Sequence, residues 1–381
     1  MRLASPGAGS DVGQLRRVAY LSLQTPCEGR ATYTHVHEIV RGLRDLGYVV
    51  KLYAPSCAER GRRRRLPARL LAFVTLQIRL LRHLQCHDAL YVRAHPAALP
   101  AALIARLAKR MVVHEVNGPY ADAYINNPRL RALARLLAAV QRWQYRHANG
   151  LICVTEGLAD WLRGEAPAVP SSVIPNGANV ELFSPDRERW PGLDGNYVVF
   201  FGGLNAWHGV DWMLNAATSP LWPDGIALVV VGEGPGGAAV QAAAAAYPAR
   251  VRRLGQLPYE EVGRVVAHAR ASLIPIVDCE DRSAAGLAPI KLFETLACGV
   301  PAIVSDLPGL SALVRKHGLG RVVPEGDVEA LAAAVHDACA GDGLSTALRA
   351  RARALAVREF SWSTRAEQIV AFLTNLETSQ G

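Results

Sequence analysis

Residues 197–235 have the sequence YVVFFGGLNAWHGVDWMLNAATSPLWPDGIALVVVGEGP. This stretch contains an apolar segment, a glycine turn, a helical pattern at residues 210–217, and a second apolar segment that ends in another glycine turn. Almost continuous apolar strands that alternate with helices are typical of parallel sheets covered on both faces. The stretch therefore predicts one βαβ unit of a doubly wound domain.

The same alternation precedes this stretch. Short apolar runs predict strands, and amphipathic runs between them predict helices. Strands are expected at residues 18–22, 49–54, 89–92, 111–116 and 150–154, and helices at 33–46, 97–109 and 130–147. This order is that of consecutive βαβ units, which form a parallel sheet.

The alternation also continues after it. Further strands are expected at residues 251–254, 271–275, 302–305 and 320–323, and helices at 237–246, 259–269, 290–297, 328–340 and 362–376. The chain thus begins a second parallel sheet near residue 197 and completes it near residue 323.

Two Rossmann-like, doubly wound halves of an α/β protein follow from this pattern. We expect an N-terminal domain over residues 1–190 and a C-terminal domain over 191–360. Residues 361–381 are expected to form a C-terminal helix that packs back toward the N-terminal domain, and the Pro- and charge-rich segment 184–196 to form the hinge. Two such domains place the carboxyl ends of both sheets around one cleft, where ligands bind in this type of fold.

Length and composition agree with this organisation. The 381 residues suffice for two domains. Half of the residues are apolar and a fifth are charged, which excludes a disordered polyelectrolyte. The apolar runs are too short or too interrupted for a membrane-spanning helix, and residues 1–14 lack the apolar segment of a secretory signal.

The cysteines are scattered and contain no CxxC pair. They are Cys27, Cys57, Cys86, Cys153, Cys279, Cys298 and Cys339. An odd, dispersed set in a chain of this length indicates reduced thiols in a cytoplasmic protein rather than a disulfide framework or a zinc site.

The net charge of +9 is concentrated in one place. Arg60 and residues 62–65 form a run of arginines, and an amphipathic segment with further arginines follows as far as His83. A basic amphipathic segment is typical of helices that bind anionic membrane surfaces. A solvated loop followed by an ordinary helix that faces the core explains the same pattern, and both alternatives stay open.

Polar residues follow the strand predicted at residues 111–116. His114, Glu115 and Asn117 lie within four residues of one another, immediately before a Gly-Pro turn. Polar groups at the carboxyl end of a strand face the cleft in this type of fold. We therefore expect these three residues to belong to a site, although a single histidine in a strand is also common as a structural residue.

Gly29 lies in the loop between the first strand and the first helix. Glycine at this position lets a ligand phosphate approach the free N–H groups of a helix N-terminus, and a plain strand–helix turn is the alternative. The loop does not contain GxGxxG, and no acidic residue follows the second strand to bind a ribose. These absences argue against a nicotinamide-dependent dehydrogenase.

The stretch 283–299, SAAGLAPIKLFETLACG, combines a helix start with two charged residues. Pro289 is suited to the beginning of a helix, whose first N–H groups can bind a diphosphate. Lys291 adds a positive charge, and Glu294 is placed to accept hydrogen bonds from ribose hydroxyls. The alternative is a buried helix that happens to contain one pair of charges.

Taken together, these motifs resemble those of glycosyltransferase family 4. They are HEVNGPY (114–120), IPNGAN (174–179), FFGGL (200–204), WHGVD (207–211), VVVGEGP (229–235), RRLGQLPYEEV (252–262) and APIKLFETLACGVPAIVSD (288–306). The resemblance covers nearly the whole chain and is densest in the second half. It implies a retaining, nucleotide-sugar-dependent enzyme of the GT-B fold.

The resemblance also implies roles for individual residues. Glu294 matches the second glutamate of the family's E-x7-E signature, which binds the ribose, while Ile290 and Lys291 match the helix start that faces the phosphates. Gly232 and Leu257 match turns that line the nucleobase pocket. The expected donor-binding set is Gly29, Gly203, Gly232, Leu257, Gly286, Pro289, Ile290, Lys291 and Glu294.

The chain departs from the family pattern at two places. The first glutamate of the signature is replaced by Gly286, so that Asp281 or backbone N–H groups around Gly286 become the candidates for contact with the donor sugar. The usual phosphate-binding arginine and lysine are replaced by Gly203 and His208, of which His208 can still donate to the diphosphate.

The resulting expectation is a hexosyltransferase that uses a nucleotide-diphosphate sugar and an acceptor hydroxyl, including that of a membrane- or lipid-linked glycan. Glu115 and Asn117 would orient the acceptor, His114 would bind the sugar, and His208 would help to stabilise the diphosphate. Neither a cofactor, a metal nor a nucleic acid is expected, and the predicted location is cytoplasmic, with a peripheral position on the inner face of the membrane. The alternatives are a catalytically silent GT-B protein that binds membranes or polyanions, and a GT-B sugar-nucleotide epimerase.

Overall fold

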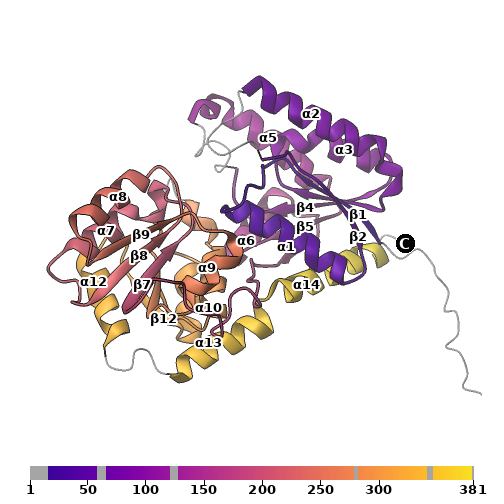
Figure 1. Cartoon of the computed structure of the whole chain (residues 1–381). Helices are drawn as coiled ribbons and strands as arrows, with labels where there is room; N and C mark the ends of the chain where they lie inside the picture. Colours follow the sequence, from indigo (N-terminus) through magenta and orange to yellow (C-terminus); the bar gives the residue numbers. More distant parts are fainter. Residues whose placement is uncertain (1–15, 58–65, 121–127, 279–281, 341–345, 380–381) are drawn as a thin grey trace, which may run out of the picture.

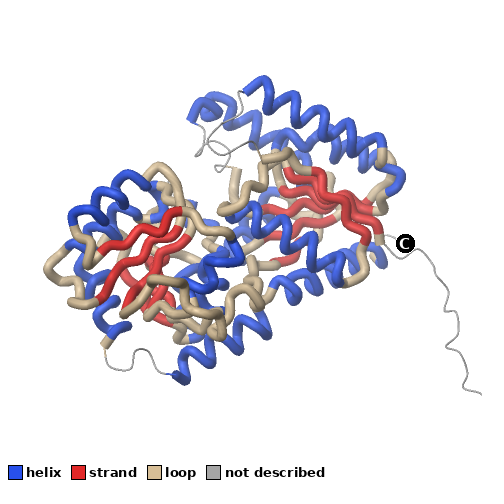
Figure 2. Tube along the Cα trace, viewed as in Figure 1, coloured by secondary structure: helices blue, strands red, loops and turns tan. Residues whose placement is uncertain are grey.

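The computed structural model describes residues 16–57, 66–120, 128–278, 282–340 and 346–379. The described residues form two α/β domains that lie next to each other (Figure 1). Each domain contains one parallel sheet of six strands, and helices cover both faces of each sheet (Figure 2). The predicted doubly wound architecture is therefore confirmed.

The first sheet has the strand order β2-β1-β3-β4-β5-β6. Its strands are β1 (Arg17–Ser22), β2 (Val49–Tyr53), β3 (Ala89–Arg93), β4 (Met111–Val116), β5 (Gly150–Cys153) and β6 (Ser171–Val173). One face packs against α1 (Ala31–Asp45) and α14 (Trp362–Thr378). The other face packs against α2 (Leu66–Arg82), α3 (Leu99–Leu107), α5 (Ala134–Arg146) and α6 (Glu156–Glu165).

The second sheet has the strand order β12-β11-β10-β7-β8-β9. Its strands are β7 (Asn196–Phe201), β8 (Ile226–Val231), β9 (Val251–Gly255), β10 (Ala271–Ile274), β11 (Ala302–Ser305) and β12 (Gly320–Val323). One face is covered by α7 (Val210–Thr218), α8 (Gly237–Ala246) and α12 (Val328–Cys339). The opposite face is covered by α9 (Tyr259–Val266), α10 (Ile290–Ala297), α11 (Leu310–His317) and α13 (Thr346–Glu359).

Among the described α-helices and strands, α6, β6, α11 and α13 were not predicted from the sequence. Strand β6 has three residues and begins with two serines, so it lacks the apolar run that predicts a strand. Helix α13 buries Leu348, Ala352, Leu355 and Ala356, and alanines give only a weak hydrophobic signal. The remaining helices and strands that were predicted are present, with their ends shifted by a few residues.

Helix α14 returns to the first domain after the second sheet is complete (Figure 1). Its residues Trp362, Ile369, Leu373 and Leu376 are buried in the core that α1 and the first sheet share. A Cβ atom on Gly42 of α1 would lie 2.7 Å from the Cβ of Ala366. The absence of a side chain at Gly42 therefore allows the two helices to approach closely.

The segment between β6 and β7 connects the two sheets. Ile174 is buried in the core of the first domain, whereas Ala178, Phe183 and Leu193 are buried in the core of the second. Most of this segment is therefore packed against the second domain before β7 begins.

Two of the cysteines form a disulfide. Cys27 follows β1 and is bonded to Cys57, which follows β2. The expectation that all cysteines are reduced was therefore wrong, because neighbouring parallel strands bring the two loops together although 30 residues separate them. Among the other described cysteines, Cys86, Cys153, Cys298 and Cys339 are free thiols, and Cys279 lies outside the described residues.

Candidate functional site

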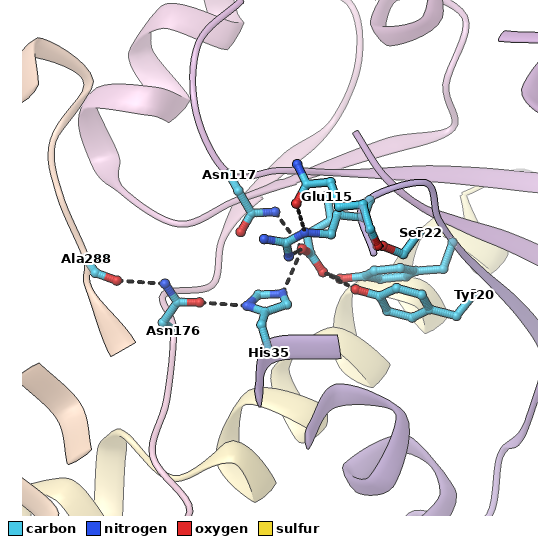
Figure 3. Close-up of polar contacts among 10 residues, drawn as sticks. Tyr20, Ser22, His35, Glu115, Asn117, Asn176 and Ala288 are labelled. Carbon is cyan, nitrogen blue, oxygen red and sulfur yellow. Dashed lines mark hydrogen bonds and ion pairs between the residues drawn. The ribbon is translucent and has the colours of Figure 1, made fainter. Parts of the chain in front are cut away.

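Glu115, at the end of β4, is the centre of a buried polar cluster (Figure 3). Its Oε1 lies 2.7 Å from Nε2 of His35 and 2.6 Å from Nη1 of Arg93. Asn117 also donates to Oε1 at 2.6 Å, while the hydroxyl groups of Tyr20 and Tyr91 donate to Oε2 at 3.1 and 3.0 Å. Burial alone would raise the pKa of Glu115, but the positive charges of His35 and Arg93 outweigh burial and hold this pKa well below its ordinary value.

This arrangement gives Glu115 a role that the sequence did not predict. The side chain is only 1% exposed, and both carboxylate oxygens already accept hydrogen bonds from protein groups. The expected direct contact between Glu115 and an acceptor hydroxyl does not fit this burial. Glu115 instead fixes the positions of its neighbours, of which Asn117 is only partly buried and remains a candidate for contact with an acceptor.

His114 lies on the opposite face of β4, since side chains alternate along a strand. Its ring meets the edge of the Tyr145 ring with 5.8 Å between centroids. The residue is 1% exposed, burial lowers its pKa to about 4, and neither ring nitrogen has a hydrogen-bond partner within the described part of the chain. The sequence analysis expected His114, Glu115 and Asn117 to belong to one site. The structure instead places His114 on the other face of β4, away from Glu115 and Asn117.

Lys291, in the first turn of α10, faces a glycine turn from the neighbouring strand β7. A Cβ atom on Gly202 would lie 3.3 Å from the Lys291 Nζ. This Nζ lies 4.2 Å from the centroid of the Phe200 ring and has no hydrogen-bond partner among the residues that the structure describes. Burial lowers the pKa of Lys291 to about 7.

Glu294 lies one helical turn after Lys291 and is 4% exposed. Its Oε1 accepts a hydrogen bond of 2.8 Å from the hydroxyl group of Tyr259, at the start of α9. Burial raises the pKa of Glu294 to about 8. Tyr259 was not predicted as a site residue, although the RRLGQLPYEEV motif contains it.

The turns that end β7 and β8 bring glycine backbones into contact. Gly232 has φ +135°, and a Cβ atom there would overlap with the carbonyl oxygen of Gly202. His208 donates from Nδ1 to the carbonyl oxygen of Gly203. A second donation, from Nε2 to a diphosphate, therefore requires the protonated ring. Gly203, Gly232 and His208 thus follow the carboxyl ends of the neighbouring strands β7 and β8.

Residues 285–289, which we call the donor loop, precede α10 and contain Gly286. Gly286 has φ +80°, and a Cβ atom there would lie 3.2 Å from the Cβ of Thr155. The contact with Thr155 and the positive φ both disfavour a glutamate at this position. The N–H groups of Gly286 and Leu287 already donate to the carbonyls of Ser283 and Pro308.

These bonds correct one expectation about the donor loop. The N–H groups of Gly286 and Leu287 are engaged within the protein, so they do not replace the missing signature glutamate. Asp281, the other candidate, lies outside the described residues.

The loop between β1 and α1 contacts the second domain. Gln256 donates from Nε2 to the carbonyl oxygen of Glu28 at 3.1 Å, and its side chain packs against Gly29. Leu257 is partly buried against the core of the second domain. Gly29 thus lies beside the turn that contains Leu257.

The last two predicted donor-binding residues lie at the beginning of α10. Pro289 is the N-cap residue of this helix. The side chain of Ile290 is buried in the core of the first domain, so only its backbone is placed to face a ligand.

Helix α2 has two different apolar faces. Phe73, Leu76 and Leu80 are buried in the core of the first domain. A second set remains exposed and consists of Leu70 (52%), Leu71 (64%), Val74 (52%) and Ile78 (43%). Arg69, Arg79 and Arg82 are exposed on the same helix. The residues 58–65 that precede α2 lie outside the described part. Among the described residues, no helix is long and apolar enough to cross a bilayer.

Comparison with protein families identifies the two halves separately. Residues 33–182 match the family model for Glycosyltransferase Family 4, and residues 195–340 match the model for Glycosyl transferases group 1. The chain belongs to glycosyltransferase family 4. The resemblance inferred from the motifs is thereby confirmed.

Curated family-4 relatives share moderate sequence identity with this glycosyltransferase. The phosphatidyl-myo-inositol mannosyltransferase of Mycobacterium leprae is 31% identical over 234 residues, which cover 60% of each chain. The amylovoran biosynthesis glycosyltransferase AmsK of Erwinia amylovora is 30% identical over 126 residues, which cover 33% of this chain and 31% of AmsK. Both alignments span less than two thirds of the relative's length.

Solved structures confirm the GT-B fold. Sucrose-phosphate synthase from Thermosynechococcus elongatus superposes with a TM-score of 0.75 at 18% identity, over 96% of this chain and 100% of that one. The Anabaena HepE complex with UDP-glucose superposes with a TM-score of 0.67 at 17% identity, over 95% of this chain and 100% of that one. At these identities the likeness establishes the fold alone.

Proposed function

We propose that this glycosyltransferase is a retaining hexosyltransferase that uses a nucleoside-diphosphate sugar. The observation that carries this proposal is Lys291. Its amine is buried without a hydrogen-bond partner in the described structure, between α10 and the Gly202 turn. An unpaired buried amine costs free energy unless an anion completes the site. The diphosphate of a donor supplies such an anion.

The proposed reaction exchanges two bonds at the anomeric carbon. The bond between this carbon and the diphosphate oxygen breaks, and the acceptor oxygen attacks from the same face. The acceptor proton passes to the departing phosphate oxygen, so no protein nucleophile is required. Lys291 and the N-terminus of α10 stabilise the negative charge on the leaving group. The approaching diphosphate also favours the protonated form of Lys291, whose pKa is near 7 in the free protein.

Glu294 is proposed to bind the ribose of the donor. Its carboxylate is buried next to α9 and α10 and has a hydrogen bond only from Tyr259 among the described groups. Ribose hydroxyl groups would supply further donors. Tyr259 holds the carboxylate in place for them.

The relatives support two candidate donors. The mycobacterial proteins are named mannosyltransferases, which favours a mannosyl donor such as GDP-mannose. HepE was solved with UDP-glucose, which favours a glucosyl donor. The names of the mycobacterial relatives also favour phosphatidylinositol as the acceptor to test first.

We further propose that the acceptor is presented at the cytoplasmic surface of an anionic membrane. The exposed apolar residues and arginines of α2 support this proposal, because a helix lies in a membrane interface when it combines these two features. Exposed apolar residues also lie on α3, which packs beside α2, and on α5, which packs beside α3; they are Leu103, Ile104, Leu107, Leu136 and Trp143. Co-sedimentation with anionic vesicles should decrease with added salt and in a variant with Ser at residues 70, 71, 74 and 78. Equal binding to neutral and anionic vesicles would contradict electrostatic docking.

The central experiment is a transfer assay with GDP-mannose, UDP-glucose and other nucleotide sugars, with vesicles that contain phosphatidylinositol and with soluble acceptors. The anomeric configuration of the product, determined by NMR, tests retention. Lys291→Met should lower the rate of transfer at least about tenfold, whereas Lys316→Met, at an exposed lysine of α11, should not. Nucleotide binding without turnover on any pair of substrates would favour a catalytically silent protein.

Transfer is also proposed to be metal-independent, so it should survive EDTA. Loss of transfer in EDTA, with recovery in Mg²⁺ or Mn²⁺, would contradict this proposal.

A further inference from the structure

Asn176 lies where three parts of the molecule meet (Figure 3). Its Nδ2 donates to the carbonyl oxygen of Ala288 in the donor loop at 2.6 Å. Its Oδ1 lies 2.7 Å from Nδ1 of His35 at the start of α1, and its own carbonyl accepts from Nε of Arg365 in α14 at 3.2 Å. The sequence analysis included Asn176 only as part of the IPNGAN motif, and the proposed chemistry does not use it.

The hydrogen bonds fix both the orientation of Asn176 and the charge of His35. A carbonyl oxygen accepts only, so the amide nitrogen of Asn176 must face Ala288 and the amide oxygen must face His35. His35 Nδ1 therefore carries a proton. Its Nε2 lies 2.7 Å from the Glu115 carboxylate, which is another acceptor. Both ring nitrogens of this buried histidine face acceptor oxygens, and the protonated ring can donate to both of them.

The charged groups around His35 come from two strands and leave an excess of positive charge. Arg93 on β3 and His35 are cations, and Glu115 on β4 is the anion between them. Tyr20 and Tyr91 complete the surroundings as neutral donors to Glu115, and the ring of Trp362 contacts His35 edge-on with 5.3 Å between centroids. The cluster therefore has a net charge of +1, and Asn176 connects it to the donor loop.

The donor loop is held from the first domain at two points. Thr155, the N-cap residue of α6, donates to the carbonyl oxygen of Ala285, and Asn176 donates to that of Ala288. The next residue is Pro289, the N-cap of α10, and Lys291 follows in the first turn. The first domain thus determines the position of the loop that leads into the helix proposed to meet the diphosphate.

We propose that Asn176 is a positioning residue for sugar transfer, which sets the donor loop from the first domain and is itself oriented by the charged form of His35. This inference rests on the proposed function, because it assigns the loop to the donor sugar. The side-chain amide of Asn176 then connects the donor loop with the polar cluster of the first domain, next to the proposed acceptor site. On its other side the loop is held within the second domain, where the N–H groups of Gly286 and Leu287 donate to the carbonyls of Ser283 and Pro308.

The test compares Asn176→Asp with Asn179→Ala in the full-length chain. In N176D one carboxylate oxygen still accepts from His35, while the other repels the carbonyl of Ala288. Asn179 lies in the same segment and donates to Glu38 of α1 at 2.8 Å, but no hydrogen bond joins its side chain to the donor loop among the described contacts. We expect kcat to fall about 30-fold in N176D, with less than about a threefold change in the Kd of UDP or GDP, since a misplaced reactant lowers turnover more than nucleotide binding. N179A should keep kcat within about threefold of the wild type.

Hydrogen exchange provides a readout that does not depend on activity. Amides of residues 283–292 should exchange faster in N176D than in the wild type with UDP or GDP present, and should be unchanged in N179A. If N176D does not fold, His35→Gln replaces it, because the single amide nitrogen of glutamine cannot occupy the positions of both ring nitrogens, which face Glu115 and Asn176. Unchanged exchange in the folded variant would overturn the proposal, as would equal losses of kcat and nucleotide affinity. A wild-type protein that turns over no donor would refute the proposed function, while the exchange result would still decide the anchoring role of Asn176.

Discussion

Glu115 and Glu294 are two buried carboxylates in adjacent domains with opposite environments. Glu115 has five neighbouring donors from β1, β3, α1 and the end of β4, two of them cationic. Glu294 has a single hydrogen bond, from Tyr259, among the described groups. The pKa of Glu115 is accordingly held well below its ordinary value, whereas burial raises that of Glu294 to about 8.

The number of hydrogen-bond partners distinguishes buried polar residues that stabilise the fold from buried polar residues that are suited to bind a ligand. A carboxylate whose lone pairs are all engaged has little capacity left for a substrate, and its removal leaves buried cations without a partner. A carboxylate or amine that is buried but poorly paired costs free energy in the free protein, and a ligand recovers that cost. By this criterion the first domain contributes a rigid polar cluster, and the second contributes Lys291 and Glu294 as binding groups.

The same substitution at both carboxylates tests this contrast directly and should have the largest effect. Glu115→Gln leaves His35 and Arg93 without their anion, and we expect a loss of about 3–5 kcal/mol of stability. Glu294→Gln replaces a group that is mostly protonated at pH 7, and should change stability by less than about 1 kcal/mol. Urea unfolding of both variants measures the difference. Equal losses would remove the distinction between the two sites.

Lys291→Met should separate stability from function. Charge-assisted hydrogen bonds to a diphosphate contribute about 1.5–3 kcal/mol, so transfer should fall at least about tenfold to 100-fold. Unfolding stability should stay the same or increase, since the substitution removes a buried, unpaired amine. The measurements are kcat/KM and the urea midpoint, with Lys316→Met as the control. A large loss of stability would show that Lys291 has a structural partner in the free protein.

The pH dependence of stability should differ in sign at the two binding groups. The pKa of Glu294 is about 8 in the folded protein against an ordinary value of 4.5, so the folded state holds the extra proton and stability falls as pH rises between these values. Lys291 has a folded pKa of about 7 against 10.5, so the unfolded state holds the extra proton and stability rises with pH over that range. Each slope is at most ~1.4 kcal/mol per pH unit.

His95 and His114 also titrate, with pKa values lowered to about 4. Subtracting the unfolding free energy of each variant from that of the wild type removes their contribution and leaves the slope that Glu294 or Lys291 produces. The stability of the wild type relative to Glu294→Gln should fall from pH 5 to pH 8. Relative to Lys291→Met it should rise above pH 7. A difference that does not vary with pH for either variant would show that the group titrates normally.

The sequence predicted the second-domain groups better than those of the first domain, for a geometric reason. Lys291 and Glu294 lie one turn apart on α10, so the helical repeat alone places them together. His35 and Asn176 are separated by 141 residues, and Glu115 lies on a strand between them. No local pattern joins such residues, and only the fold of the first domain brings them together.

Strand alternation explains another limit of the sequence analysis. The motif HEVNGPY correctly indicated a polar strand end, but His114 and Glu115 point to opposite faces of β4. The disulfide between Cys27 and Cys57 was missed because it depends on the adjacency of β1 and β2. For α2 the sequence left two interpretations open, a helix that faces the core and a helix that binds a membrane surface. The two are compatible, because one apolar face of α2 is buried and another is exposed.

The return of α14 to the first domain has a consequence for biosynthesis. The core between α1 and the first sheet includes Trp362, Ile369, Leu373 and Leu376, which are translated only after all strands of the second sheet. At about 5–20 residues per second, the ribosome needs roughly 10–40 s to progress from the end of the first sheet to this helix. During that interval the apolar side of α1 lacks its partner, so the first domain emerges early but completes its core last. The nascent chain therefore exposes the apolar side of α1 until α14 has been synthesised.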